Sequence, residues 1–134
     1  MSPYQTAGVA YQAQAVETAG PGQLVVMLYD GAIAAIARAE HSMESTDRNK
    51  IEVINHELTR AQDIVTELML SLDHDQGGSI ASNLAAIYEY CLSNLTQANL
   101  EKSPRNLPHV KAQLGRLRDA FADASAQVAA AGAA

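Results

Sequence analysis

Hydrophobic positions recur at alternating intervals of three and four residues along most of the chain, and this spacing predicts helices. The clearest stretch begins at residue 51, where polar residues occupy the opposite side. Its apolar stripe comprises Ile51, Ile54, Leu58, Ala61, Val65, Leu68 and Leu72. Two further stripes have the same period: Ile80, Leu84, Ile87, Cys91, Leu95 and Ala98, then Leu107, Val110, Leu114, Leu117, Phe121, Ala124 and Val128. Each stripe predicts an amphipathic helix, and residues 21–42 form a fourth.

Residues that begin and end helices divide the chain in the same way. Pro21 favours a helix start, because proline is accepted at the first helical position. Asp47 is expected to cap the second helix, and the polar turn 73–78 to end it and lead into the third. Pro108 would clash inside a helix, which places the last start near Asn106. Four helices with short connections predict an all-α fold, an antiparallel up-down four-helix bundle over residues 20–128.

Two segments lie outside the predicted bundle. Residues 1–19 form a polar and alanine-rich N-terminal arm with a few apolar points, which is expected to be partly flexible and to pack over the bundle. Residues 129–134 form a Gly/Ala tail that is expected to fray, as chain ends without large side chains do.

The first and third predicted helices carry more apolar residues than a bundle needs, which is about three positions in seven. The run LVVMLYDGAIAAI, residues 24–36, has one charge, Asp30, and extends beyond its expected stripe of Leu24, Leu28, Ala35 and Ala39. Three interpretations of this apolar surplus stay open. The first and third helices lie more centrally in the bundle, the arm covers their extra apolar surface, or that surface is a groove that receives an amphipathic segment of a partner. Gly31 indicates a point where another helix or the arm approaches, with Asp30 at its solvent edge.

Charge and cysteine content limit which partners the protein is expected to bind and in which cellular compartment it is expected. Lys and Arg total 9 against 15 for Asp and Glu, a formal net charge of -6, which argues against nucleic acid and against an anionic membrane. The single cysteine, Cys91, excludes an internal disulfide and is expected in the core of a protein from a reducing compartment. No signal-peptide pattern opens the chain, and run 24–36 is shorter than the ~20 residues of a membrane span. We therefore expect a cytoplasmic protein without membrane insertion.

No motif predicts catalysis, a cofactor or a metal. A di-metal bundle uses Glu-x-x-His pairs, whereas the residues three before the four histidines are Arg38, Val53, Ser71 and Asn106. The acidic turn at Asp73 resembles the start of a calcium loop, but the position of the required glutamate is Leu84. We expect a protein that is not an enzyme and has no catalytic, cofactor-binding or metal-binding residues.

Three local patterns, in order and at compatible spacing, resemble the flagellin-specific export chaperones, the FliS family. Residues 10–39, AYQAQAVETAGPGQLVVMLYDGAIAAIARA, are similar to the family's opening, with its arm tyrosine and LMLYDGA element. Residues 72–100, LDHDQGGSIASNLAAIYEYCLSNLTQANL, and residues 117–121, LRDAF, match two later elements. The resemblance covers about residues 10–125. Departures from the family pattern stand at Gly20, Gln23, Ser79 and Phe121, and none removes a class of apolar contact.

The resemblance implies a function. Such proteins bind the disordered C-terminal segment of newly made flagellin, which folds into helices along their apolar grooves and is kept from premature polymerisation. The complex is then delivered to the flagellar type III export gate, and the arm can cover part of the binding surface in the free state. Carried onto this chain, the family features make Tyr11, Met27, Leu28, Tyr29, Asn83, Ile87, Tyr88 and Leu95 the candidate client-binding residues, in the core or in the groove.

The main alternative is a self-associating structural bundle without a client, in which the surplus apolar faces form a homodimer. A bundle that binds a small molecule or a metal would need inward polar groups, which only Tyr29, Tyr88 and Asn83 offer. The expected oligomeric state is a monomer or a weak homodimer.

Overall fold

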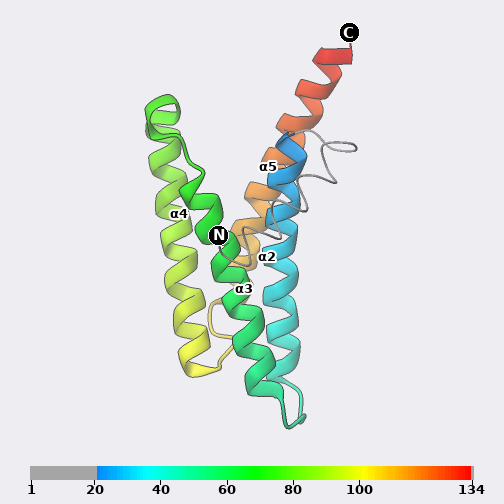
Figure 1. Ribbon diagram of the computed structural model, residues 1–134, viewed down its shortest axis with the longest axis vertical. Helices are drawn as coiled ribbons and strands as arrows, with labels where there is room; N and C mark the ends of the chain where they lie inside the picture. Colours follow the sequence, from blue (N-terminus) through cyan, green and yellow to red (C-terminus); the bar gives the residue numbers. More distant parts are fainter. Residues whose placement is uncertain (1–20, 134) are drawn as a thin grey trace.

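The computed structural model describes residues 21–133, and within this range the chain forms helices and no strand (Figure 1). The helices are α2 (Pro21–Met43), α3 (Lys50–Leu70), α4 (His74–Glu101) and α5 (Leu107–Ala133). Each helix runs antiparallel to the next along the chain (Figure 1). The predicted all-α, antiparallel four-helix bundle is therefore confirmed. The predicted arm, residues 1–19, lies outside the described residues.

Helix α2 packs between α3 and α5 and supplies the centre of the core. Its fully buried side carries Tyr29, Ala32 and Ile36, whereas Leu24 and Leu28 of the expected stripe are only half-buried. The expected stripe on α2 was thus partly wrong, because a helix that is apolar nearly all round has no polar side to mark its outward face. The whole helix, unlike the run 24–36, is long and apolar enough to span a membrane by length and composition, but its buried side belongs to the core of this bundle.

Two glycines of α2 face its neighbours. A Cβ built on Gly31 would lie 3.4 Å from Cδ1 of Ile64 on α3, so the predicted approach of another helix at Gly31 is observed. A Cβ built on Gly22 would lie 2.7 Å from Oγ of Ser125 on α5, which is closer than two such atoms can approach. The start of α2 therefore touches α5 more tightly than Gly31 touches α3.

The start of α3 differs from the prediction. Asn49, not Asp47, is the N-cap residue, and its side chain makes no capping hydrogen bond. Asp47 belongs to the preceding turn, where its backbone N–H donates to Oγ of Ser45 and its carbonyl accepts from the N–H of Lys50. The turn satisfies backbone groups that a side-chain cap would otherwise serve. Past its first turn α3 follows the predicted stripe, since Ile54, Leu58, Ala61, Val65 and Leu68 are buried.

Helix α4 begins with a short helical turn and a kink. The carboxylate of Asp73 accepts from the backbone N–H groups of Asp75 and Gln76, so the predicted polar turn is itself capped. Gly78 then takes φ 51° and ψ -123°, which interrupts the helix. This is the conformation of the first central residue of a type II′ turn, which favours glycine. The main part of α4 follows the kink, as the sequence predicts.

Helix α5 starts at Leu107, as expected from Pro108, and the residue before it, Asn106, has a positive φ of 63°. The helix continues to Ala133, so most of the tail that is expected to fray is helical here. Alanine has the highest helix propensity, and four of the last five helical residues are alanine.

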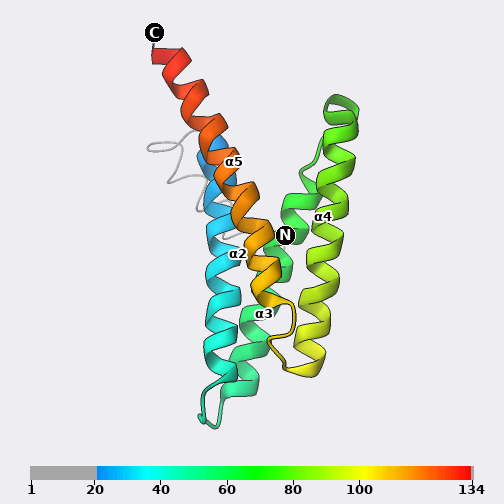
Figure 2. The same cartoon turned by 180° about the vertical axis from the view of Figure 1, so that it is seen from behind.

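The bundle is closed at one end and open at the other. Near the connection between α4 and α5, the side chain of Asn106 donates to the side chain of Asn94, and the ring of Tyr90 meets His109 edge-on at 5.6 Å. Beyond this level the two helices diverge, and their far ends lie well apart in both views (Figures 1 and 2). Close contact between α4 and α5 is correspondingly sparse, whereas α2 packs extensively on α3 and α5.

Candidate functional site

Three aromatic side chains from three helices meet at the level where α4 and α5 separate. Tyr29 of α2 and Tyr88 of α4 are buried, and their hydroxyls are hydrogen-bonded to each other. The ring of Phe121 on α5 lies 5.7 Å from that of Tyr29, centroid to centroid, and the two tyrosine rings are 6.5 Å apart. Such separations are normal for packed aromatic pairs. This aromatic centre therefore joins α4, α2 and α5 across the core.

The buried ionisable groups here are held in their neutral forms. Burial raises the pKa of Tyr29, and its hydrogen bond to Tyr88 raises it further. Burial also raises the pKa of Tyr88, and it raises the pKa of the Cys91 thiol to about 11. A thiol with a raised pKa is a poor nucleophile, because the thiolate is the reactive form. Among residues 21–133 no three His, Cys, Asp or Glu side chains lie together as metal ligands would.

Apolar side chains remain uncovered where α4 and α5 diverge. On α4, Ile80 and Ile87 share a face with Asn94, which contacts the start of α5, so this face looks towards α5. On α5 the buried stripe continues outward through half-buried side chains to exposed Val128. Ile80 is 69% exposed and Val128 73%. We define the open-end surface as Ile80, Leu84, Ile87, Leu117, Phe121 and Val128.

The position of α5 beside this surface is fixed by its seam with α2. Arg118 Nε donates to Oδ1 of Asp30 at 3.0 Å, and Lys111 pairs with Glu40 at 2.5 Å. Asp30 is thus ion-paired at a solvent edge, although the contact beside it is α5 and not the neighbour of Gly31. Together with the Gly22–Ser125 approach, these contacts attach α5 to α2 over most of the seam.

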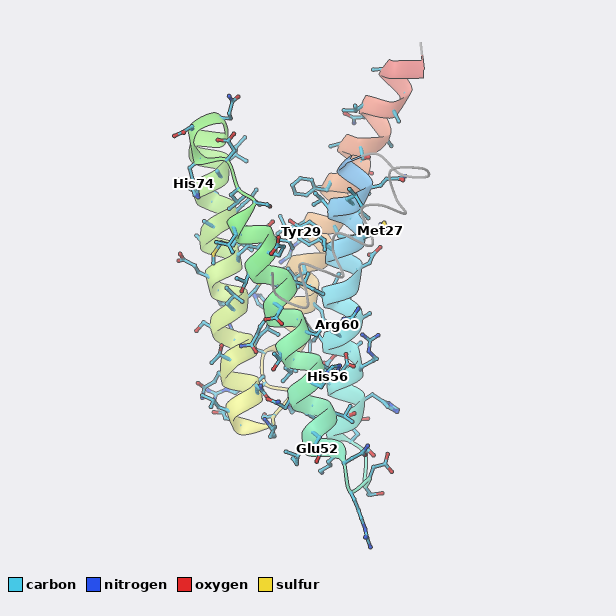
Figure 3. All side chains as sticks on the ribbon, in the orientation of Figure 1. Met27, Tyr29, Glu52, His56, Arg60 and His74 are labelled. Atoms are coloured by element: carbon cyan, nitrogen blue, oxygen red, sulfur yellow. The ribbon has the colours of Figure 1, made fainter. Side chains whose placement is uncertain are left out.

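The predicted client-binding residues do not form one patch. Tyr29, Tyr88 and Leu95 are buried in the core. Leu28 and Ile87 are half-buried against it, and Asn83 is exposed on α4. Met27 is half-buried on the opposite side of α2 from Tyr29 (Figure 3). Tyr11 lies outside the described residues.

Sequence reasoning assigned Ile80, Phe121 and Val128 to core stripes and did not consider them as binding residues. They follow the helical period as core residues do, and the divergence of α4 and α5 leaves Ile80 and Val128 exposed and Phe121 half-buried. One signal was present in the sequence: residues 120–131 contain a single aliphatic residue larger than alanine, Val128. A helix end with so few large apolar residues cannot draw α4 closely towards it.

The geometry is that of a four-helix bundle with an uncovered apolar surface between two diverging helices. Its sequence matches the family model described as flagellar protein FliS over residues 3–128. It is 34% identical over 124 residues to the flagellar secretion chaperone FliS of Salmonella typhimurium, which covers 88% of this chain and 90% of that protein.

Two further relatives agree. The flagellar secretion chaperone FliS of Bacillus subtilis is 34% identical over 115 residues, 86% of this chain and 83% of that protein. The flagellar secretion chaperone FliSB of Pseudomonas aeruginosa is 32% identical over 114 residues, which cover 85% of this chain and 86% of that protein. The chain belongs to the FliS family of flagellar secretion chaperones, which is not a family of enzymes. The resemblance seen in the sequence is thereby confirmed.

Proposed function

We propose that this protein is a cytoplasmic export chaperone that binds the disordered C-terminal segment of flagellin, prevents its premature polymerisation and delivers it to the flagellar type III export gate. The exposure of Ile80 and Val128, on the two helices that diverge, is the observation that supports it. Membership of a flagellar secretion chaperone family supports the class of client.

The open-end surface suits a client that folds as it binds. An amphipathic helix docks by laying an apolar face on an apolar surface. Ordering a disordered segment costs ~2–5 kcal/mol and goes with burial of ~1,000–3,000 Å², so the contact must be long. The open-end surface alone is shorter than this requires, and we include the side of α2 that carries Met27 as a second part of the contact.

The proposed contacts differ from the sequence candidates in one respect. Tyr29, Tyr88 and Leu95 support the surface from within the core, since their side chains are buried. Ile87 and Asn83 are proposed to touch the client directly, together with Met27. Tyr11 stays a proposed contact of the arm.

Calorimetric titration with the C-terminal segment of a flagellin from the same organism tests this function. The wild-type protein is expected to bind one segment with a large negative heat-capacity change. Ile80→Asp should weaken binding by roughly tenfold or more, because it places a charge in an apolar contact. Leu100→Asp is the matched control, since Leu100 is an equally exposed aliphatic residue, at 76%, on another face of α4.

If both substitutions weaken binding equally, or if neither weakens it, the client does not bind at the open-end surface. A wild-type protein that binds no segment and instead self-associates in sedimentation would favour the structural bundle. We propose a monomer or weak homodimer as the free state, with no nucleic-acid partner and no membrane insertion.

A further inference from the structure

Helices α2 and α4 lie diagonally in the bundle, and their backbones do not come into close contact within residues 21–133. The hydrogen bond between the hydroxyls of Tyr29 and Tyr88 is the polar contact that joins them. Because both side chains are buried, each hydroxyl has exchanged water for the other tyrosine. The two rings meet at an angle through their hydroxyls, with their centroids 6.5 Å apart, and this contact sets the distance between the two helices at this level.

The exposed side chains of the open-end surface favour a different arrangement, in which α4 lies closer to α5. The upper part of α4 is its N-terminal part, which carries Ile80. Moving it onto α5, a movement that we call closure, would remove Ile80 and Val128 from water, and such burial is favourable. Helix α5 cannot easily move to meet α4, because the Asp30–Arg118 and Glu40–Lys111 pairs and the Gly22–Ser125 approach attach it to α2. Closure thus requires α4 to move relative to α2.

That movement would separate the two hydroxyls. Tyr29 cannot follow Tyr88 freely, since its ring also packs on Phe121 of α5. A buried hydroxyl that loses its partner is unfavourable by about as much as a lost hydrogen bond. The hydroxyl pair therefore opposes the closure that the exposed apolar side chains favour.

We propose that the Tyr29–Tyr88 hydroxyl pair is a spacer that holds the upper part of α4 away from α5 and keeps the open-end surface available. Both tyrosines are positioning residues and do not touch the client. The consequence for client affinity rests on the proposed function, whereas the spacing itself is a property of the free protein.

Spin labels on the two diverging helices measure the spacing directly. The double variant Tyr29→Phe/Tyr88→Phe removes both hydroxyls and keeps both rings. Labels attached at Ser82→Cys on α4 and Asp123→Cys on α5 report the separation by pulsed electron resonance, since both sites are exposed. The native Cys91 is 0% exposed and does not take the label in the folded protein. Tyr90→Phe is the matched control, because it removes one hydroxyl from an exposed ring on the same helix.

The double variant is expected to shift the distance distribution to shorter values, whereas Tyr90→Phe should leave it as in the wild type. An unchanged or longer distance in the double variant overturns the proposal and leaves the pair a stabilising contact of the core. Circular dichroism verifies that the variants fold. If the double variant does not, Tyr88→Phe alone, which also releases the contact, takes its place with the same expected shift.

Client affinity supplies the second readout. A closed form must reopen before it binds, so the double variant is expected to bind the flagellin segment between about three- and tenfold more weakly, and Tyr90→Phe equally to the wild type. Unchanged affinity beside a shortened distance overturns the effect on the client and leaves the spacing itself, which the distances decide. A wild-type protein that binds no segment instead refutes the proposed function, and the distances in the free protein still decide whether the spacer exists.

Discussion

At the scale of single residues, the core that residues 21–133 form is apolar except for three buried ionisable side chains: Tyr29, Tyr88 and Cys91. The two hydroxyls satisfy each other, and the thiol behaves as a small apolar group. All three have a raised pKa because burial disfavours the charged form. They consequently link stability to alkaline pH and not to acid.

The free energy of unfolding is expected to fall above pH 9. The folded protein holds the Cys91 proton more tightly than the unfolded chain, with a pKa of about 11 against 9.0. The stability contributed by this thiol is thus complete below pH 9 and is lost as the pH rises to 11, on the order of 2 kcal/mol. Urea unfolding at several pH values measures it. In Cys91→Ala the decline should begin only near pH 10, where the tyrosines of the unfolded chain ionise; an identical decline in both proteins would contradict the prediction.

Two glycines of one helix should respond to alanine with opposite signs. Gly31→Ala is expected to stabilise the protein by up to about 1 kcal/mol, since alanine favours the helix and the new methyl would meet only the end of Ile64 at 3.4 Å. Gly22→Ala is expected to destabilise it by about 1–3 kcal/mol, because both Oγ and Cβ of Ser125 lie within 2.8 Å of the new atom. Thermal unfolding of the two variants compares them. Stabilisation by both would show that α5 yields at its seam with α2.

At the scale of elements, the two ends that surround the open-end surface are built differently. Helix α4 begins with a capped turn and a kink at Gly78, whereas α5 runs on as an alanine-rich helix to Ala133. The kink separates the first turn of α4 from its main part. The long end of α5 holds its helix by propensity, because the side chains of residues 126–131 are exposed.

The effect of backbone strain at Gly78 can be measured separately from any steric clash. Neither Gly78 nor Gly115 has any neighbouring atom within 4 Å of a built Cβ, but only Gly78 has a positive φ. Gly78→Ala is therefore expected to destabilise the protein by about 1–3 kcal/mol through strain alone. Gly115→Ala, in the interior of α5, is expected to stabilise it by up to about 1 kcal/mol. Chemical denaturation of both variants measures the difference, and equal effects would rule out strain at the kink.

At the scale of the whole molecule, stability is concentrated in α2 and its two neighbours. Helix α2 packs along α3 and α5, while α4 is joined mainly to α3 and, through the aromatic centre, to α2. Two polar side-chain contacts set the register of α3 and α4: Gln62 with Thr96 and Asn55 with Asn99. The open-end surface thus lies where the bundle is least closed.

Amide hydrogen exchange should follow this gradient. The slowest amides are expected in α2 and α3, around Tyr29–Ala39 and Ile54–Leu68, where side chains are buried. Residues 126–131 of α5 should exchange about 100-fold faster or more, because their side chains are already exposed and opening them uncovers almost no new apolar surface. Uniform protection along α5 would mean that its end is covered, for instance by a second copy of the chain.

The sequence by itself determined the parts of this protein that depend on local periodicity and local chemistry. The four helices, the starts at Pro21 and Leu107, and the burial of Cys91 follow from the spacing of apolar residues and the constraints of proline. The family followed from three motifs in order along the chain. These features require only neighbours within a few turns, so no knowledge of packing was needed.

Only the tertiary structure decided which apolar residues are covered. Tyr29 and Tyr88 proved to be core, and Ile80 and Val128 proved to be surface, although all four lie in apolar helical runs. Helical period states which residues share a face, but exposure depends on the distance to the next helix. That distance depends on how α5 approaches α2 at Gly22 and on how α4 diverges from α5. Both depend on helices whose residues are far apart in the sequence.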